Sequence, residues 1–329
     1  MSDSAVHSNR FRGPLLLSFL LPLGTTADSA PVPSAADEPP APGTYIWVDD
    51  HRLHLDCRGS GAPTVVFDSG LGGSSLDWTL VQPEVASFTR ACAYDRAGYA
   101  WSDPGPLPRN AENIVRDLEQ LLGNGSVAAP YVLVGHSLGG LIAQHFARQN
   151  PQRIAGLVLV DATHEDQFRR LEEAITPSGN VRRWSLLTMR DSYDIPEGLP
   201  DNVRLLAGAF VARPQSIVVA RSELSFLRRN AHSAAAATGA MPDVPLVVIS
   251  HRVFPPVTAN RESRLADMWM EMQLELAALT RRSRHVVAAT DDHYVHIREP
   301  GIVIDAVRSV VEQHRREGDG ETGGRGTHQ

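Results

Sequence analysis

The sequence predicts an α/β protein whose mostly parallel sheet is covered by helices on both faces. From residue 44 onward, short apolar runs alternate with segments whose apolar residues recur at helical spacing. The runs at 64–67, 131–135 and 157–160 are uninterrupted, as is typical of strands buried on both faces. Strand and helix then repeat in a regular order, which indicates a parallel sheet.

The folded part begins with a hairpin over residues 44–49 and 51–57, closed by an Asp-rich turn. Further strands are expected at 64–67, 91–94, 131–135, 157–160, 244–249 and 285–289, and helices at 81–88, 114–122, 141–149 and 302–311. These elements place the core of the fold at residues 44–163 and 243–316.

Residues 164–242 interrupt this rhythm. They contain no convincing strand, and the arginine-rich stretches at 203–212 and 215–229 have a helical pattern. An insertion of this size between two core strands predicts a helical cap over the carboxyl edge of the sheet. Residues 317–329, rich in glycine and charge, are expected to form a disordered tail.

The first 27 residues are typical of an export signal. Arg10 and Arg12 precede a short apolar stretch at 15–23, and small residues allow cleavage after Ala27. We therefore expect a secreted or extracytoplasmic protein, with residues 28–43 as a Pro/Ala-rich linker. The other interpretation is a disordered extension on a cytoplasmic protein. The apolar stretch is shorter than the roughly 20 residues of a membrane span, so no stable span is expected.

Composition excludes several classes of function. The net charge of the 329 residues is −7, which gives no electrostatic support for nucleic-acid binding. All 31 basic residues are arginine. The chain therefore lacks the amine required by a Walker A loop, a Schiff base or pyridoxal-phosphate attachment. The sequence does not indicate an oligomeric state.

The pattern Gly-His-Ser-Leu-Gly at 135–139 follows an apolar strand and precedes a helix. This is the G-x-S-x-G nucleophile elbow, in which a sharp turn lifts a serine hydroxyl above the sheet edge. Gly135 and Gly139 are expected there because a Cβ atom at either position would collide with a neighbouring element. The pattern predicts Ser137 as a nucleophile.

A serine hydroxyl needs a base and donors for the developing oxyanion. His293 lies in the loop after the last predicted strand, at the same sheet edge as Ser137, and His296 is its rival. One oxyanion donor is expected to be the amide of Leu138. The second is expected to be the amide of Leu71, in a glycine-rich loop that includes Gly70 and follows the third strand.

These motifs, in this order, resemble the α/β-hydrolase superfamily over residues 44–311. The similar segments are 69–73, 94–103, 135–140 and 292–294. The resemblance implies Ser137 as nucleophile and His293 as base, with an oxyanion hole formed by the amides of Leu71 and Leu138. It also implies no metal and no organic cofactor.

The resemblance further implies that the second and fourth strands are neighbours, which would bring Cys57 close to Cys92. A disulfide between them is one interpretation in an exported protein. Two buried free thiols are the other.

The acid of the triad is the point at which the chain departs from the family pattern. No carboxylate follows the seventh strand before Glu262. Some members place the acid at the end of the sixth strand, where this chain has Asp161. We therefore predict Asp161, with Glu262 and Glu165 as alternatives.

Together these residues predict a serine hydrolase that cleaves a small carboxylic ester through Ser137, His293 and Asp161, with an acyl-enzyme intermediate. The alternatives are a peptidase, a thioesterase, a C–C hydrolase, a cofactor-free haloperoxidase or a non-catalytic binding protein of the same fold. Epoxide hydrolases and haloalkane dehalogenases are disfavoured because those relatives carry an aspartate at the elbow.

Overall fold

The computed structural model describes residues 39–175, 195–229, 231, 239–253 and 261–323. The expected signal peptide, most of the linker, the middle of the cap and the last six residues lie outside this range.

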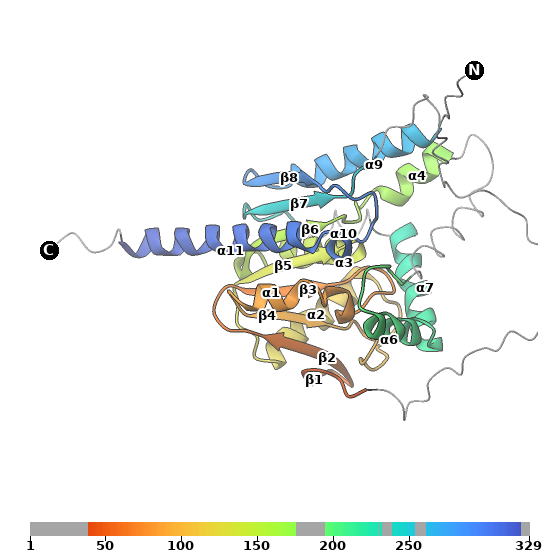
Figure 1. Cartoon of the computed structure of the whole chain (residues 1–329), viewed down its shortest axis with the longest axis horizontal. Helices are drawn as coiled ribbons and strands as arrows, with labels where there is room; N and C mark the ends of the chain where they lie inside the picture. The colour runs from red at the N-terminus through yellow and green to blue at the C-terminus, as the bar shows by residue number, and fades with distance from the viewer. Residues whose placement is uncertain (1–38, 176–194, 230, 232–238, 254–260, 324–329) are drawn as a thin grey trace, which may run out of the picture. The chain divides into compact units, whose positions relative to one another are not determined.

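The sheet has eight strands in the order β1-β2-β4-β3-β5-β6-β7-β8 (Figure 1). The hairpin strands β1 and β2 are antiparallel, β2 is antiparallel to β4, and every other pair is parallel. This confirms the predicted fold class. The strands are β1 (Thr44–Val48), β2 (His51–Arg58), β3 (Thr64–Asp68), β4 (Ala91–Tyr94), β5 (Tyr131–His136), β6 (Ile154–Val160), β7 (Leu246–Ser250) and β8 (Ser283–Val287).

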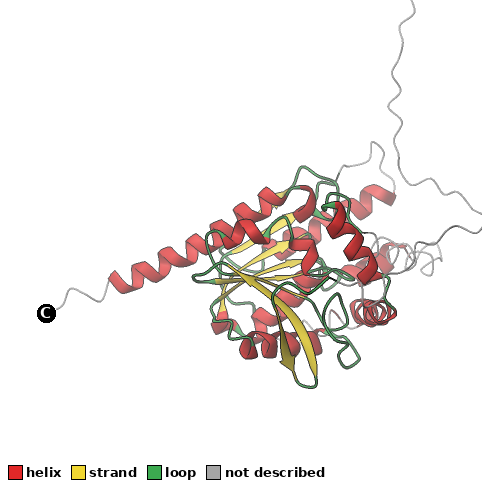
Figure 2. Ribbon diagram, turned by 60° about the horizontal axis from the view of Figure 1, so that its bottom comes forward, coloured by secondary structure: helices red, strands yellow, loops and turns green. Residues whose placement is uncertain are grey.

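Helices cover both faces of the sheet (Figure 2). Side chains of α2, α3 and α9 pack on one face, and side chains of α1 and α11 pack on the other. The helices are η1 (Ser75–Trp78), α1 (Gln82–Ala86), α2 (Ala111–Asn124), α3 (Leu138–Gln149), η2 (Pro151–Arg153), α4 (Gln167–Ile175), α6 (Asp201–Val211), α7 (Pro214–Arg229), α9 (Arg261–Ala277), α10 (Val295–Arg298) and α11 (Pro300–Gly323).

The prediction of a disordered tail from residue 317 is wrong for its first part, because α11 continues to Gly323. Once a helix has formed, each added residue makes one more backbone hydrogen bond for one more residue ordered. A glycine inside a helix costs only about 1 kcal/mol relative to alanine, so the helix continues through Gly318 and Gly320.

The insertion between β6 and β7 contains α4, α6 and α7 among its described residues. In Figure 1, α6 and α7 lie beyond one end of the strands, while the last turns of α11 extend beyond the other. Within the described residues, no single helix has the length and apolarity to cross a membrane, and only the bent pair α6 and α7 meets that criterion jointly.

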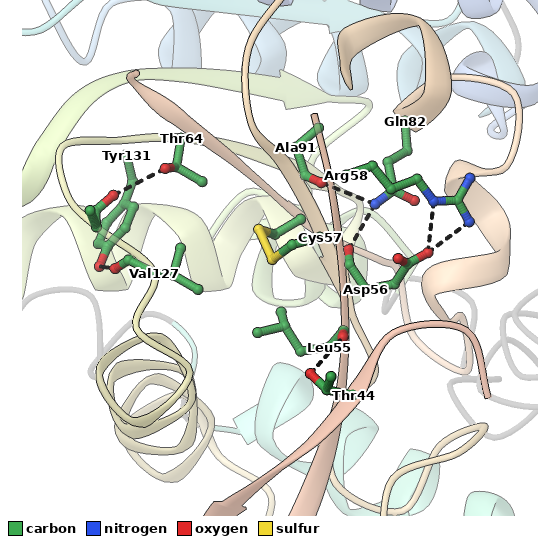
Figure 3. The surroundings of a disulfide bond; sticks show 12 residues. Thr44, Leu55, Asp56, Cys57, Arg58, Thr64, Gln82, Ala91, Val127 and Tyr131 are labelled. Carbon is green, nitrogen blue, oxygen red and sulfur yellow. Dashed lines mark hydrogen bonds and ion pairs between the residues drawn. A yellow bond between two sulfur atoms is a disulfide. The ribbon is translucent and has the colours of Figure 1, made fainter. Parts of the chain in front are cut away.

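A disulfide joins Cys57 of β2 to Cys92 of β4, at directly opposed positions of the antiparallel pair (Figure 3). The side-chain amide of Gln82 spans the same two strands, donating to the carbonyl oxygens of Asp56 (2.8 Å) and Ala91 (3.1 Å). Closing a loop over a sequence separation of 35 residues restricts the unfolded chain by an amount worth about 4 kcal/mol. The hairpin is thereby fastened to the parallel part of the sheet.

Candidate active site

Ser137 occupies the sharp turn between β5 and α3. Its backbone lies at φ 50° and ψ −119°, a region that non-glycine residues rarely adopt. A Cβ atom on Gly139 would lie 2.2 Å from the carbonyl oxygen of Asp68, and one on Gly135 would lie 2.4 Å from the carbonyl oxygen of Gly139. Both positions therefore require glycine, as predicted.

Asp161 follows β6, the neighbour of β5, and its carboxylate is fully buried. Backbone hydrogen bonds hold Asp161 beside the turn at Ser137. Ser137 N–H donates to the carbonyl oxygen of Val160 (3.1 Å), and Thr163 N–H donates to that of Ser137 (3.0 Å). Asp161 itself has φ 46°, so two residues in the left-handed region end two adjacent central strands.

His293 lies in the loop after β8, with Nδ1 2.5 Å from Oδ2 of Asp161. Burial alone would raise the pKa of Asp161, but hydrogen bonds from His251 and His293 lower this pKa to about 2. An ionised carboxylate only accepts, so Nδ1 of His293 carries the proton and Nε2 is left as an acceptor. Ser137 and His293 line the same cavity. The structure thus brings together the three predicted side chains at one sheet edge.

The two alternative acids do not share this arrangement. Glu165 pairs with Arg148 at 3.4 Å. The side chain of Glu262, at the start of α9, lies outside the described part of the chain.

His251 is the site residue that the sequence analysis missed. Its ring Nδ1 lies 2.8 and 2.7 Å from the two carboxylate oxygens of Asp161, and its backbone N–H donates to Oδ1 at 3.0 Å. The ring stacks on Trp269. Burial disfavours the charged ring, but the contact with Asp161 outweighs burial and raises the pKa of His251. Its position directly after β7 was a usable signal, because parallel strands end at a common edge.

Asp161, His251 and His293 are also the described residues whose ligand atoms lie close enough together for a metal ion, within 4.8 Å of one another. Zinc bonds of about 2.0–2.1 Å in a tetrahedron would separate the ligand atoms by about 3.4 Å. The two imidazoles lie only 2.5–2.8 Å from the carboxylate oxygens. These separations are those of hydrogen bonds.

Two further histidines are buried beneath the site. His136 donates through Nε2 to the carbonyl oxygen of His293 at 3.1 Å, and burial holds the pKa of its ring well below the usual value. His296, the rival base, is completely buried between Trp78 and His136, and burial lowers its pKa to about 3. Both rings are neutral supports of the loop that carries His293.

The glycine-rich loop after β3 lies against the elbow. A Cβ atom on Gly70 would lie 3.3 Å from Cβ of Ser137. The carbonyl oxygen of Gly70 accepts a hydrogen bond from Arg96 at 2.7 Å. Because the C=O and N–H of a trans peptide point in opposite directions, the N–H of Leu71 points away from Arg96. The N–H of Leu138, in the first turn of α3, has no acceptor within its helix.

A cavity of about 800 Å³ opens over these groups. Its walls come from the sheet edge and from the described cap helices, whose contributions are Gln167 and Phe168 of α4, Arg204 of α6, and Leu224 and Leu227 of α7. The volume is within the range of small-molecule sites.

Comparison with known proteins agrees with the fold described above. Residues 65–315 match the model of the alpha/beta hydrolase family. A protein of Bacillus subtilis named YqjL is 27% identical over 272 residues, covering 81% of this chain and 90% of that protein.

Two solved structures share the fold. A thermophilic esterase from Thermogutta terrifontis superposes with a TM-score of 0.60 at 20% identity, covering 82% of this chain and 98% of the esterase. The enol-lactonase from Burkholderia xenovorans LB400 gives a TM-score of 0.60 at 18% identity, covering 82% and 100%. With the family match over most of its length, this chain belongs to the alpha/beta hydrolase family.

Proposed function

We propose that the protein is a serine hydrolase that cleaves a small carboxylic ester through an acyl-enzyme on Ser137. The observation that carries this proposal is the contact between buried Asp161 and Nδ1 of His293 at the sheet edge where Ser137 stands. That contact fixes the ring so that Nε2 is the basic atom, which is what a serine nucleophile requires.

In the proposed reaction, Ser137 Oγ attacks the ester carbonyl carbon and its proton passes to Nε2 of His293. The N–H groups of Leu71 and Leu138 stabilise the oxyanion of the tetrahedral intermediate. His293 then gives the proton to the departing alkoxide, and the alcohol leaves. A water molecule, deprotonated by His293, attacks the acyl-enzyme, and collapse of the second intermediate releases the carboxylic acid and restores Ser137.

Covalent labelling tests this proposal. A fluorophosphonate probe is expected to label the wild-type protein, and Ser137→Ala is expected to abolish both labelling and hydrolysis in a panel of p-nitrophenyl esters. Loss of the nucleophile of a serine hydrolase costs about 10⁶-fold in kcat. Ser126→Ala, on an exposed turn after α2, is the matched control and should behave like wild type. An unlabelled wild-type protein would overturn the proposal and favour a non-catalytic binding protein.

We also propose that the protein works outside the cytoplasm. The signal-like N-terminus and the disulfide between Cys57 and Cys92 support this, because disulfides persist in oxidising compartments. Expression with a C-terminal tag should yield extracytoplasmic protein whose N-terminal residue is Asp28, as read by intact mass. Full-length protein confined to the cytoplasm would contradict this expectation.

A further inference from the structure

A buried ionic cluster lies behind the glycine-rich loop and joins it to the cap. It consists of Asp68 at the end of β3, Arg96 after β4 and Glu223 on the cap helix α7, and we call it the Arg96 cluster. The side chains are 6%, 2% and 0% exposed, respectively. Arg96 Nε lies 2.9 Å from Oε1 of Glu223, and Nη1 lies 2.6 Å from Oδ1 of Asp68.

The remaining N–H groups of Arg96 donate to the glycine-rich loop after β3 and to Glu223. Nη1 also donates to the carbonyl oxygen of Ser69 (2.5 Å), while Nη2 donates to that of Gly70 (2.7 Å) and to Oε2 of Glu223 (3.3 Å). A guanidinium has five N–H groups in a rigid plane, and all five are used here. The plane therefore cannot turn without releasing a partner, and Glu223 accepts two of the five bonds that hold it.

A second connection runs from the same carboxylate. The hydroxyl of Tyr99 donates to Oε2 of Glu223 at 2.8 Å and accepts from the N–H of Gly72 at 3.3 Å. One cap side chain thus reaches both ends of the peptide segment that contains Leu71. The helix itself is docked against the core, because Val219 of α7 packs on Tyr99 and Ser222 accepts from the N–H of Arg109 at 2.9 Å.

We propose that Glu223 is a positioning residue for the oxyanion hole, so that the seating of α7 on the core determines where the N–H of Leu71 points. The inference rests on the proposed function. The role of α7 would be to hold the oxyanion loop in place, because moving this helix away would release Arg96 and, with it, the carbonyl of Gly70. Substrate specificity and oxyanion stabilisation are then coupled through one helix, which also lines the cavity with Leu224 and Leu227.

The variant Glu223→Gln keeps the shape of the side chain and can still accept from Nε of Arg96. Its amide nitrogen meets the N–H of Nη2, so the guanidinium must shift. We expect kcat for the best ester of the panel to fall about 10- to 100-fold, below the 10²- to 10³-fold cost of losing an oxyanion donor altogether. The affinity for a boronic acid, which forms a tetrahedral adduct with the serine, should fall by the same factor.

Ground-state binding separates positioning from a merely structural role. The Kd of the same ester, measured in a Ser137→Ala background, should be unchanged by Glu223→Gln. Ser225→Ala, on the same helix and outside the cluster, removes a hydroxyl that accepts from Arg229 of that helix and should leave kcat and boronic acid affinity near wild type. Equal losses in ester binding and boronic acid affinity, or the same losses in Ser225→Ala, would overturn the inference.

If Glu223→Gln does not fold, Tyr99→Phe replaces it, because it removes the connection to Gly72 and keeps the ion pair. It should lower kcat and boronic acid affinity together by about 3- to 10-fold, in line with the modest net strength of the hydrogen bonds to Glu223 and from Gly72 that are lost with the hydroxyl. If kcat and boronic acid affinity of Tyr99→Phe both equalled the wild-type values, the inference would also be overturned. Fluorophosphonate labelling of the wild type distinguishes this failure from failure of the proposed function.

Discussion

Asp161→Asn is expected to lower kcat about 10⁴-fold with little change in KM. The corresponding change in a serine protease triad has an effect of this size, because the amide no longer holds the imidazole in the reactive tautomer. Here the buried carboxylate also accepts from His251, so an amide, which has a single acceptor oxygen, must leave one of the two imidazole N–H groups facing its own NH2 group. Steady-state kinetics on the best ester of the panel, together with a check that fluorophosphonate labelling slows in parallel, provides the measurement.

Glu165→Gln is the matched control for Asp161→Asn, since it neutralises one of the two alternative carboxylates that the sequence analysis named. Its partner is Arg148, so its activity should stay near wild type. The reverse order of effects would contradict the assignment of Asp161.

The lowered pKa of Asp161 also predicts how the stability of the fold depends on pH. A carboxyl whose folded pKa lies below its unfolded value stabilises the fold above the unfolded pKa, near 4, and loses that contribution as pH falls towards 2. The stability difference between wild type and Asp161→Asn should shrink over that interval.

Gly139→Ala is expected to lower the free energy of unfolding by about 3 kcal/mol or more, and to reduce activity in whatever protein remains folded. The three atoms nearest to the added methyl would all be backbone atoms, the nearest being the carbonyl oxygen of Asp68 at 2.2 Å. Backbone in the centre of a sheet cannot move aside as a flexible side chain can. Urea unfolding followed by circular dichroism measures the loss.

Gly301→Ala is the control for this effect. Gly301 is the second residue of α11, as Gly139 is the second residue of α3, and nothing lies within 4 Å of where its Cβ would be. This variant should be stabilised by about 0.5–1 kcal/mol, because alanine loses less chain entropy on folding. If both variants behaved alike, steric contact at the elbow would not be the reason for glycine at position 139.

The order of the strands in the sequence was sufficient to predict at which edge of the sheet the candidate site residues lie. Ser137, Asp161 and His293 each follow a core strand, and parallel strands deliver the residues after them to one edge whatever lies between. His251 obeys the same rule and was still missed, because only a carboxylate was sought after the seventh strand. The rule predicts where a side chain lies, whereas the role of His251 depends on the partner it meets there.

Glu223 could not have been found in this way. It lies in the middle of an arginine-rich helix, and nothing in its local pattern distinguishes it from an exposed helical glutamate. Its burial depends on the docking of α7 against residues that precede it by more than a hundred positions. The end of α11 was mispredicted for a related reason, since composition alone does not tell how far an established helix will continue.

The left-handed backbone of both Ser137 and Asp161 has a consequence for heat resistance. Such conformations cost about 1–3 kcal/mol each and persist only where the surroundings enforce them. Here the enforcing bonds come from Val160, Ile249 and Thr163, which belong to or adjoin the innermost strands. The turns at Ser137 and Asp161 should thus be lost at the same temperature at which the scaffold melts, because the bonds that hold them break only when the central strands separate.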